Sequence, residues 1–177
     1  VFGKSPDVDV STKGGNAKTS IPDVKSSLAT DEDLVAIHKM DKDNFEGSYT
    51  IDEDFNAYKA DLDDREVATY ALKSDDGKVM GYYQLEPIEN GELYIYSIGV
   101  PPELQKTKSS YAVLKKIQEE ITKTANEKGV KKVVLDVDAD NKALVKLYEK
   151  FGFKITGEES GIEAGTPYHD YRMEIDV

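Results

Sequence analysis

The sequence predicts an α+β domain in which helices flank a mixed, mostly antiparallel, twisted sheet. Two observations lead to this prediction. Between residues 66 and 100, apolar and polar residues alternate in three segments separated by the turn sequences DDG at 75–77 and NG at 90–91, a pattern typical of hairpins. From residue 109 the apolar period becomes helical, and helical and strand segments then alternate. That order is typical of a strand–helix–strand crossover with local parallel pairing.

The first half of the domain is expected to contain four strands and one helical region. The segment LVAIHKM is short and β-prone, so it predicts a first strand at 34–40. Weak helical signals within residues 43–64 centre on Phe55–Leu62. A three-stranded meander follows, formed by the alternating segments 66–74, 78–87 and 92–100.

The second half begins with a long amphipathic helix at 109–129. Ser109 or Ser110 is expected to cap its start and Gly129 its end. The apolar residues that form one face of this helix are Leu114, Ile117, Ile121 and Ala125.

A buried strand at 131–137 leads into a second helix at 143–151, which Asp140 or Asn141 would cap. Two strands, 153–158 and 168–177, close the chain, and the Gly-rich segment between them is predicted to be a mobile loop.

Residues 1–33 differ from the rest because they contain few large apolar side chains. Such a segment cannot bury enough surface to offset its ordering entropy. The sequence therefore predicts an extended N-terminal arm or linker at 1–33 and a globular domain at 34–177. We expect the arm to contact another chain or to lie extended across this one.

The composition excludes several classes of site and partner. The chain has 177 residues, a net charge of −12, no cysteine and two histidines, without an HExxH motif. Disulfides and thiol nucleophiles are excluded, and no metal site is expected. The negative charge disfavours nucleic acid, and no apolar run approaches the roughly 20 residues of a membrane helix. The first residues lack a secretion signal, which predicts a cytoplasmic protein or a component of a particle assembled there.

Two motifs resemble those of GNAT N-acetyltransferases. VVLDVDADNKALVKLYEKFGF at 133–153 has the family's strand, Asn141, Ala143, Tyr148 and the ending Phe151–Phe153 at matching positions. SIGVPPELQ at 97–105 resembles the V-x-P-E-x-[RQ] entry to the family's cofactor loop. With the element order included, the resemblance covers residues 34–177.

This resemblance implies that acetyl-coenzyme A binds where the fourth and fifth strands of the family fold separate. The pantetheine arm would lie along Ile98, Gly99 and Val100, with the pyrophosphate at the loop and helix start that follow. The implied cofactor-binding positions there are Gln105, Lys106, Lys108, Ser109 and Ser110, and the matching Asn141 is counted with them.

The loop departs from the family's [RQ]-G-x-G-x-[GA] pattern, because Lys106, Lys108 and Ser110 occupy its small-residue positions. Glycine lets a backbone approach phosphate closely, so these side chains should crowd the pyrophosphate. The alternative is that the two lysines supply charge in place of backbone amides. Acetyl-coenzyme A binding is accordingly expected to be weak or lost.

The resemblance also implies that Tyr148 is the general acid for the departing thiolate, a role that suits a neutral phenol. Its position on an apolar stripe is equally consistent with a core tyrosine. Glu92 is the candidate general base because it is the one carboxylate within its predicted strand, although a solvated role is also open. His38 and His169 are rivals because imidazole titrates near neutral pH.

Two functions remain open from the sequence. The first is acetyl transfer from acetyl-coenzyme A to a primary amine on a small molecule or a protein, for which the acidic chain would attract a cationic acceptor. The same acidity would also serve solubility alone. The second is a structural subunit of a larger assembly, such as a virion, that has the same fold without the activity.

Overall fold

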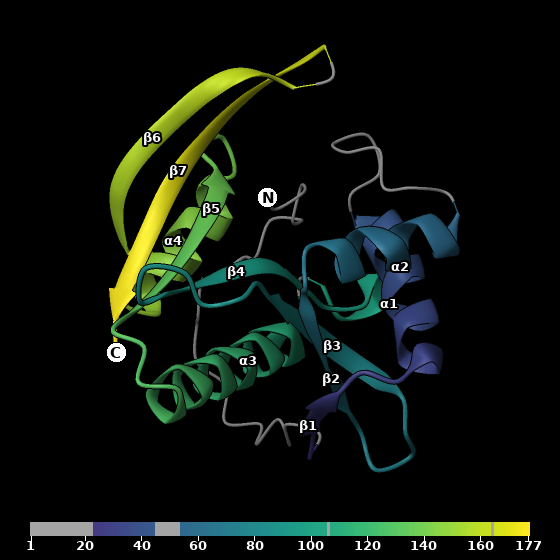
Figure 1. The fold of residues 1–177 in the computed structure, drawn as a ribbon. Coiled ribbons are helices and arrows are strands. Elements are labelled where there is room, and N and C mark those ends of the chain that lie inside the picture. Colours follow the sequence, from purple (N-terminus) through teal and green to yellow (C-terminus); the bar gives the residue numbers. More distant parts are fainter. Residues whose placement is uncertain (1–22, 45–53, 106, 164) are drawn as a thin grey trace.

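A seven-stranded sheet with the order β1-β2-β3-β4-β5-β7-β6 forms the centre of the computed structural model (Figure 1). The structure describes residues 23–44, 54–105, 107–163 and 165–177. All neighbouring strands are antiparallel except β4 and β5, so the predicted mixed, mostly antiparallel sheet is confirmed. The strands are β1 Lys25–Leu28, β2 Ala68–Lys73, β3 Val79–Leu85, β4 Glu92–Gly99, β5 Lys132–Asp138, β6 Lys154–Glu163 and β7 Thr166–Asp176.

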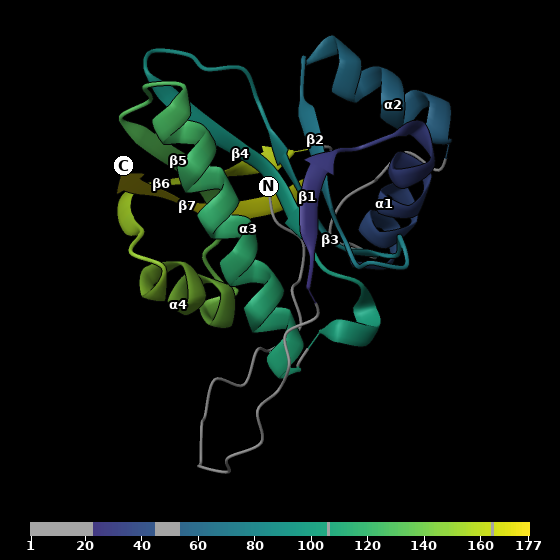
Figure 2. The same cartoon turned by 90° about the horizontal axis from the view of Figure 1, so that it is seen from below.

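Helices cover both faces of the sheet (Figures 1 and 2). They are α1 Asp31–Asn44, α2 Phe55–Asp64, α3 Lys108–Glu127 and α4 Lys142–Lys150, with a 3-10 turn η1 at Pro102–Leu104. None of these described helices is long and apolar enough to cross a membrane. Each face of the sheet has its own hydrophobic core. Tyr83 packs in the core beneath α3 and α4, whereas its neighbour Tyr82 packs in the core beneath α1.

Side chains cap both predicted helices of the second half. Thr107 caps α3 by accepting a hydrogen bond from the Ser110 amide at 3.3 Å, so the predicted caps Ser109 and Ser110 are wrong by two or three positions. At the other end Gly129 adopts a positive φ of 68° just after the helix. Asn141, one of the two predicted candidates, caps α4 by accepting from the Leu144 amide at 3.1 Å.

The strand predicted at 34–40 is wrong, because these residues belong to α1. Its start is a reciprocal cap: the Thr30 amide donates to Asp33 Oδ2 at 2.9 Å, and the Asp33 amide donates to Thr30 Oγ1 at 3.2 Å. Three acidic residues in the first turn also suit the helix dipole. The helix buries Ile37 and Met40 against the sheet, and this burial outweighs the β propensity of a short segment.

The sheet begins inside the segment predicted as an arm. Residues 25–28 form β1, which pairs antiparallel with β2 from Lys25↔Lys73 to Leu28↔Tyr70. The chain then enters α1 at Asp31. Residues 23–33 are thus part of the folded domain, whereas residues 1–22 lie outside the described residues, and the expected contact of the arm with another chain stays a prediction.

The mobile loop predicted between the last two strands is also wrong, because β6 and β7 continue through it as a long hairpin. Figure 1 shows this hairpin extending beyond the rest of the sheet. The glycine that suggested a loop has a packing role: a Cβ on Gly161 would lie 2.7 Å from Cε1 of the paired Tyr168. Among the described strands, β6 pairs only with β7 and forms one edge of the sheet.

A buried polar cluster fastens α1 and α2 to the sheet. The Tyr58 hydroxyl donates to Asp41 Oδ2 at 2.9 Å, and the Tyr82 hydroxyl donates to Asp41 Oδ1. Tyr82 also shares a 3.1 Å hydrogen bond with Ser97 Oγ on β4. Gln84 Nε2 donates to the Tyr58 hydroxyl at 2.9 Å. Burial raises the pKa of Asp41 to about 7, although its hydrogen bond from Tyr58 opposes the shift.

Gly99 on β4 leaves room for the Tyr82 ring, because a Cβ there would lie 2.2 Å from Tyr82 Cε1. We expect Gly99→Ala to lower the free energy of unfolding by about 1–3 kcal/mol through overpacking. Urea denaturation measures this loss. Gly157→Ala is the matched control, since its Cβ would lie 3.4 Å from Arg172 Cβ. Equal losses in the two variants would contradict the steric explanation.

The raised pKa of Asp41 predicts a pH-dependent stability. In the folded protein Asp41 keeps its proton up to about pH 7, whereas its ordinary value is 3.8. Its contribution to the free energy of unfolding is therefore full below pH 3.8. This contribution is lost as the pH rises to about 7, and the loss is on the order of a few kcal/mol. Urea denaturation between pH 4 and 8 should show that Asp41→Asn lacks this loss.

Asp33 provides a control of opposite sign. Burial raises its pKa, but hydrogen bonds from the Thr30 amide and from Lys73 outweigh burial and lower it. Asp33 is thus ionised in both the folded and unfolded states through most of the range from pH 4 to 7, and Asp33→Asn should keep the decline of the parent protein. The assignment to Asp41 fails if Asp41→Asn keeps the same decline.

Candidate active site

The pairing between β4 and β5 ends early and opens the sheet. The two strands pair in parallel only from Glu92↔Lys132 to Tyr94↔Val134. Beyond that point the described residues of β4 pair with β3 alone, and β5 continues with β7. Figure 1 shows β5 and β7 turning away from β4. No described strand therefore pairs with the edge of β4 that faces β5 from Ile95 onward.

A bulge in β4 lies where the strands separate. Ile95 pairs with Leu85 and Ser97 pairs with Gln84, which leaves Tyr96 without a direct partner on β3. A bulge of this kind changes which face the following residues use. As a result Ile95 and Ile98 both face the α3–α4 side, whereas the Ser97 side chain faces Tyr82 on the α1–α2 side.

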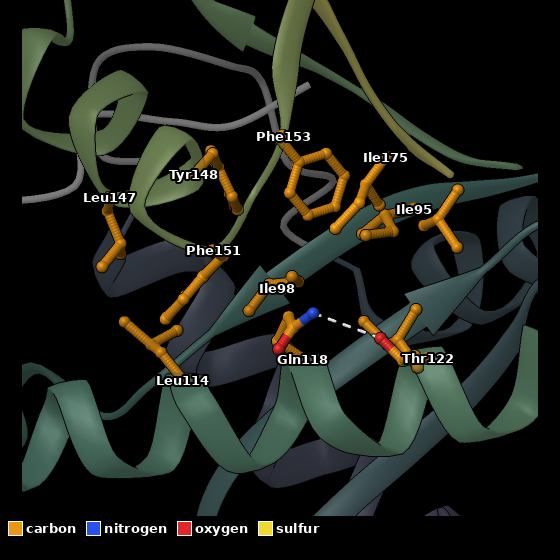
Figure 3. A pocket seen from close by; sticks show the side chains of 12 residues that line it. Ile95, Ile98, Leu114, Gln118, Thr122, Leu147, Tyr148, Phe151, Phe153 and Ile175 are labelled. Atoms are coloured by element: carbon orange, nitrogen blue, oxygen red, sulfur yellow. Dashed lines mark hydrogen bonds between the residues drawn. The ribbon is translucent and has the colours of Figure 1, made fainter. Parts of the chain in front are cut away.

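The structure places an apolar cavity at the separation, between β4, α3 and α4 (Figure 3). Its empty volume is about 390 Å³, including the part open to solvent. Gln118 and Thr122 on α3 are among its few polar side chains, and Gln118 Nε2 donates to Thr122 Oγ1 at 3.2 Å. The other lining residues are Ile95, Ile98, Leu114, Ile121, Val133, Leu147, Tyr148, Phe151, Phe153 and Ile175.

Tyr148 reaches the cavity from α4 (Figure 3). Only 4% of the residue is exposed, and its ring packs edge-on against Phe153 with 5.7 Å between centroids. Burial raises the pKa of Tyr148 above its ordinary value, so the phenol keeps its proton at neutral pH. Tyr148 is therefore both a core residue and a wall of the cavity. Its role as general acid stays a prediction.

Two of the predicted pantetheine positions, Ile98 and Gly99, lie at the open end of β4 and the third, Val100, follows it. Their surroundings differ. Ile98 lines the cavity. Gly99 lies beneath the Tyr82 ring on the other face. The Val100 carbonyl accepts a hydrogen bond from Asn44 Nδ2 at 3.2 Å. The predicted phosphate residue Gln105 donates to Asn44 Oδ1, which ties the start of the loop to the end of α1.

The predicted phosphate positions continue into the first turn of α3. The Ser110 amide is bonded by Thr107, and Ser110 Oγ donates to the Thr107 carbonyl at 2.8 Å. Ser110 is buried, Ser109 is half-buried and Lys108 is exposed, while Lys106 lies outside the described residues. Asn141 lies at the start of α4, where its side chain is used as the helix cap. The first turn of α3 thus already uses one of the amides that an anion would need.

The structure places the three candidate bases away from the cavity lining. Glu92 is at the paired end of β4, where it accepts a 2.6 Å hydrogen bond from Arg172 Nη2. His38 is not in a strand but in α1, buried with its ring 4.7 Å from the Tyr58 ring. His169 on β7 is 2.6 Å from Glu158 on β6. The role of Glu92 as general base stays a prediction.

Sequence reasoning missed the cluster of Asp41, Tyr82 and Ser97, because α1 was expected to be a strand. It also missed a group of carboxylates on the α1–α2 side of the sheet, namely Asp136 and Asp138 of β5 and Asp170 of β7. The Tyr94 hydroxyl donates to Asp136 at 2.8 Å. Burial, together with Asp138 and Asp136, raises the pKa of Asp170. Strand alternation in 132–138 was the available signal, since it places Asp136 and Asp138 on one face.

Comparison with known proteins agrees with this geometry. The model of the acetyltransferase (GNAT) family matches residues 34–153. No curated protein matches the chain. Among solved structures, the ribosomal-protein-S18-alanine N-acetyltransferase of Escherichia coli superimposes with a TM-score of 0.65 at 18% identity, covering 87% of this chain and 94% of its own.

A second solved structure is spermidine N-acetyltransferase from Vibrio cholerae in complex with coenzyme A and spermine. It has a TM-score of 0.67 at 20% identity and covers 86% of this chain and 95% of its own. At these identities the structures show a shared fold. The match to the family model spans more than half of the chain and includes both motifs that carried the resemblance. The chain therefore belongs to the acetyltransferase (GNAT) family.

Proposed function

We propose that the chain is an N-acetyltransferase that transfers the acetyl group of acetyl-coenzyme A to a primary amine. The observation that carries the proposal is the apolar cavity beside the unpaired edge of β4, with the buried hydroxyl-bearing side chain of Tyr148 in its wall. An unpaired strand edge can bond an extended pantetheine arm as an added strand would. The family membership gives this arrangement its chemical interpretation.

The residues present fit one part of the cofactor better than the other. The cavity lining suits the aliphatic parts of pantetheine, and Ile98 to Val100 would run beside the arm. The pyrophosphate would meet the first turn of α3, where Thr107 already bonds the Ser110 amide and Lys108 replaces a small residue. We therefore propose weak binding of the cofactor, limited at its phosphate end.

Acetyl-coenzyme A, when bound, would supply an activated acyl group. The coenzyme A thiolate would leave as the amine nitrogen bonds to the carbonyl carbon. Tyr148 would give its proton to the leaving sulfur, a role that its neutral, buried phenol permits. Because only the hydroxyl is needed, the ring can serve the core at the same time. The amine must reach the carbonyl carbon unprotonated, so a group on the acceptor side must remove a proton.

The acceptor would approach from the α1–α2 side, where Asp136, Asp138 and Asp170 gather. Carboxylates at that opening favour the approach of an ammonium group. Of the two solved structures named above, one is a ribosomal-protein-S18-alanine N-acetyltransferase and the other is a spermidine N-acetyltransferase in complex with spermine. A primary amine on a small cation or on a protein is accordingly the proposed acceptor.

Acetyl transfer can be tested with acetyl-coenzyme A and three acceptors: spermidine, a peptide with an N-terminal alanine, and a lysine-containing peptide. We expect Tyr148→Phe to lower kcat on the order of 10²–10⁴-fold. The KM for acetyl-coenzyme A should stay nearly unaltered, since the ring remains. Circular dichroism and urea denaturation check that the variant folds. Unchanged turnover in Tyr148→Phe would remove Tyr148 from the mechanism.

Calorimetric titration of the parent protein with acetyl-coenzyme A separates the two functions left open by the sequence. Binding together with turnover of any of the three amines supports the enzyme. An absence of both binding and turnover would favour a structural subunit that has the fold without the activity.

The sequence of the loop predicts that two glycine substitutions strengthen the binding of acetyl-coenzyme A. Lys106→Gly combined with Lys108→Gly should tighten acetyl-coenzyme A binding in calorimetry, because close backbone approach matters more at a helix start than added side-chain charge. The matched pair Lys106→Ala with Lys108→Ala removes the same charges without adding glycine, and should not tighten binding to the same degree. If both pairs weaken binding, the lysines themselves are phosphate ligands.

A further inference from the structure

We propose that Ser97, Tyr82 and Asp41 form a proton relay that deprotonates the acceptor amine, with Asp41 as the group that finally holds the proton. The inference rests on the proposed acetyl transfer and assigns the base which that reaction requires. Only Ser97 would touch the acceptor, and Tyr82 and Asp41 act through it.

The relay is a continuous chain of hydrogen bonds from β4 to α1. Ser97 Oγ is 3.1 Å from the Tyr82 hydroxyl, and that hydroxyl donates to Asp41 Oδ1. Because Tyr82 gives its proton to Asp41, the bond between the other two groups is donated by Ser97. Every bond in the chain then points toward Asp41, which is the polarity that proton movement from β4 requires.

Ser97 connects the relay to the site. It belongs to the part of β4 that has no partner on the β5 side, and it lies next to Ile98, which lines the cavity. Its side chain faces the α1–α2 side, from which the acceptor would approach, while Ile98 faces the cofactor side. Because of the bulge at Tyr96, Ser97 points to the face of the sheet that carries the relay, and the next residue, Ile98, points to the face that carries the cavity.

The surroundings of Asp41 hold it in one orientation and favour proton uptake. Tyr58 from α2 donates to Oδ2, which leaves Oδ1 for Tyr82 from β3. Among the described residues, Tyr96 of β4 and His38 of α1 are titratable groups close to this cluster, and the His38 ring lies against Tyr58. The carboxylates Asp136, Asp138 and Asp170 lie on the same side of the sheet. Burial raises the pKa of Asp41 to about 7, so the carboxylate can accept a proton and release it near neutral pH. Glu92, by contrast, is bonded to Arg172.

Protons balance along the chain. The acceptor ammonium gives one proton to Ser97 Oγ as Ser97 passes its own to the Tyr82 oxygen, and Tyr82 passes its own to Asp41. The free amine forms the new nitrogen–carbon bond, the carbon–sulfur bond breaks, and the sulfur takes the Tyr148 proton. The remaining excess proton of the amide nitrogen restores Tyr148, and Asp41 releases its proton to solvent.

The test is the pH dependence of kcat/KM for whichever of spermidine, the N-terminal-alanine peptide and the lysine peptide the parent turns over best. In the parent, kcat/KM should rise with pH through about 7, where Asp41 ionises. Asp41→Asn, Tyr82→Phe and Ser97→Ala should each lower kcat/KM about 10²-fold or more and remove that rise. The double variant Asp41→Asn with Tyr82→Phe should lose no more than either single variant, because the groups act as one unit.

Tyr83→Phe is the matched control. Tyr83 follows Tyr82 on the same strand but faces the opposite core, where its hydroxyl is 3.1 Å from Ser26 Oγ. It should leave the pH profile unchanged. Calorimetry with acetyl-coenzyme A should give the same affinity for the relay variants as for the parent. If Asp41→Asn does not fold, Tyr82→Phe and Ser97→Ala test the relay, since each removes a single hydroxyl.

The outcomes separate the relay from the function on which it rests. Loss of the rise near pH 7 in the relay variants, with Tyr83→Phe unchanged, supports the relay. Variants that are slower at every pH but keep the rise would show that the cluster only supports the fold, and the relay is overturned while the acetyltransferase stands. If the parent acetylates none of the three amines, the proposed function and the relay are both overturned.

Discussion

The early end of pairing between β4 and β5 is the constraint on which both sides of the site depend. Parallel pairing stops at Tyr94↔Val134, and the bulge at Tyr96 follows immediately. Because the bulge adds one residue to β4, the strand sends Ile98 toward α3 and α4 and Ser97 toward α1 and α2. A regular strand paired along its whole length would close the cavity edge and break the alignment of Ser97 with Tyr82. The same local irregularity therefore creates a place for a cofactor and a polar path to the opposite face.

Several side chains at this site serve folding and chemistry together. Tyr148 packs within the main core, yet it lines the cavity. Asp41 fastens two helices to the sheet, although an ionised carboxylate is costly to bury. Hydrogen bonds from two tyrosines offset part of that cost, and the raised pKa reports the remainder. Groups held this firmly lose little freedom when they react, which is the usual benefit of preorganisation.

The sequence predicted the meander, α3, α4, the Asn141 cap and the family, because each has a strong local signal. The prediction failed for elements whose structure depends on tertiary contacts. Helix α1 depends on the Thr30–Asp33 cap and on burial of Ile37. Strand β1 is short, polar and specified by pairing with β2. Ser97, Tyr82 and Asp41 come together only when β4, β3 and α1 pack, so no spacing within one segment could indicate their cluster. The cavity wall at Tyr148 was predictable because its motif is contiguous.

Strand β6 has a consequence for the behaviour of the protein in mildly acidic solution. It forms an edge of the sheet, and its exposed residues include Glu158, Glu159 and Glu163 as well as the apolar Ile155 and Ile162. Near neutral pH the carboxylates repel the same edge of a second molecule, as charged edge strands generally do. Toward the isoelectric point of about 4.6 the net charge of the whole chain approaches zero and repulsion between molecules fades, while the exposed isoleucines of β6 remain. Strand-to-strand self-association through β6 is thus a colloidal risk specific to acidification.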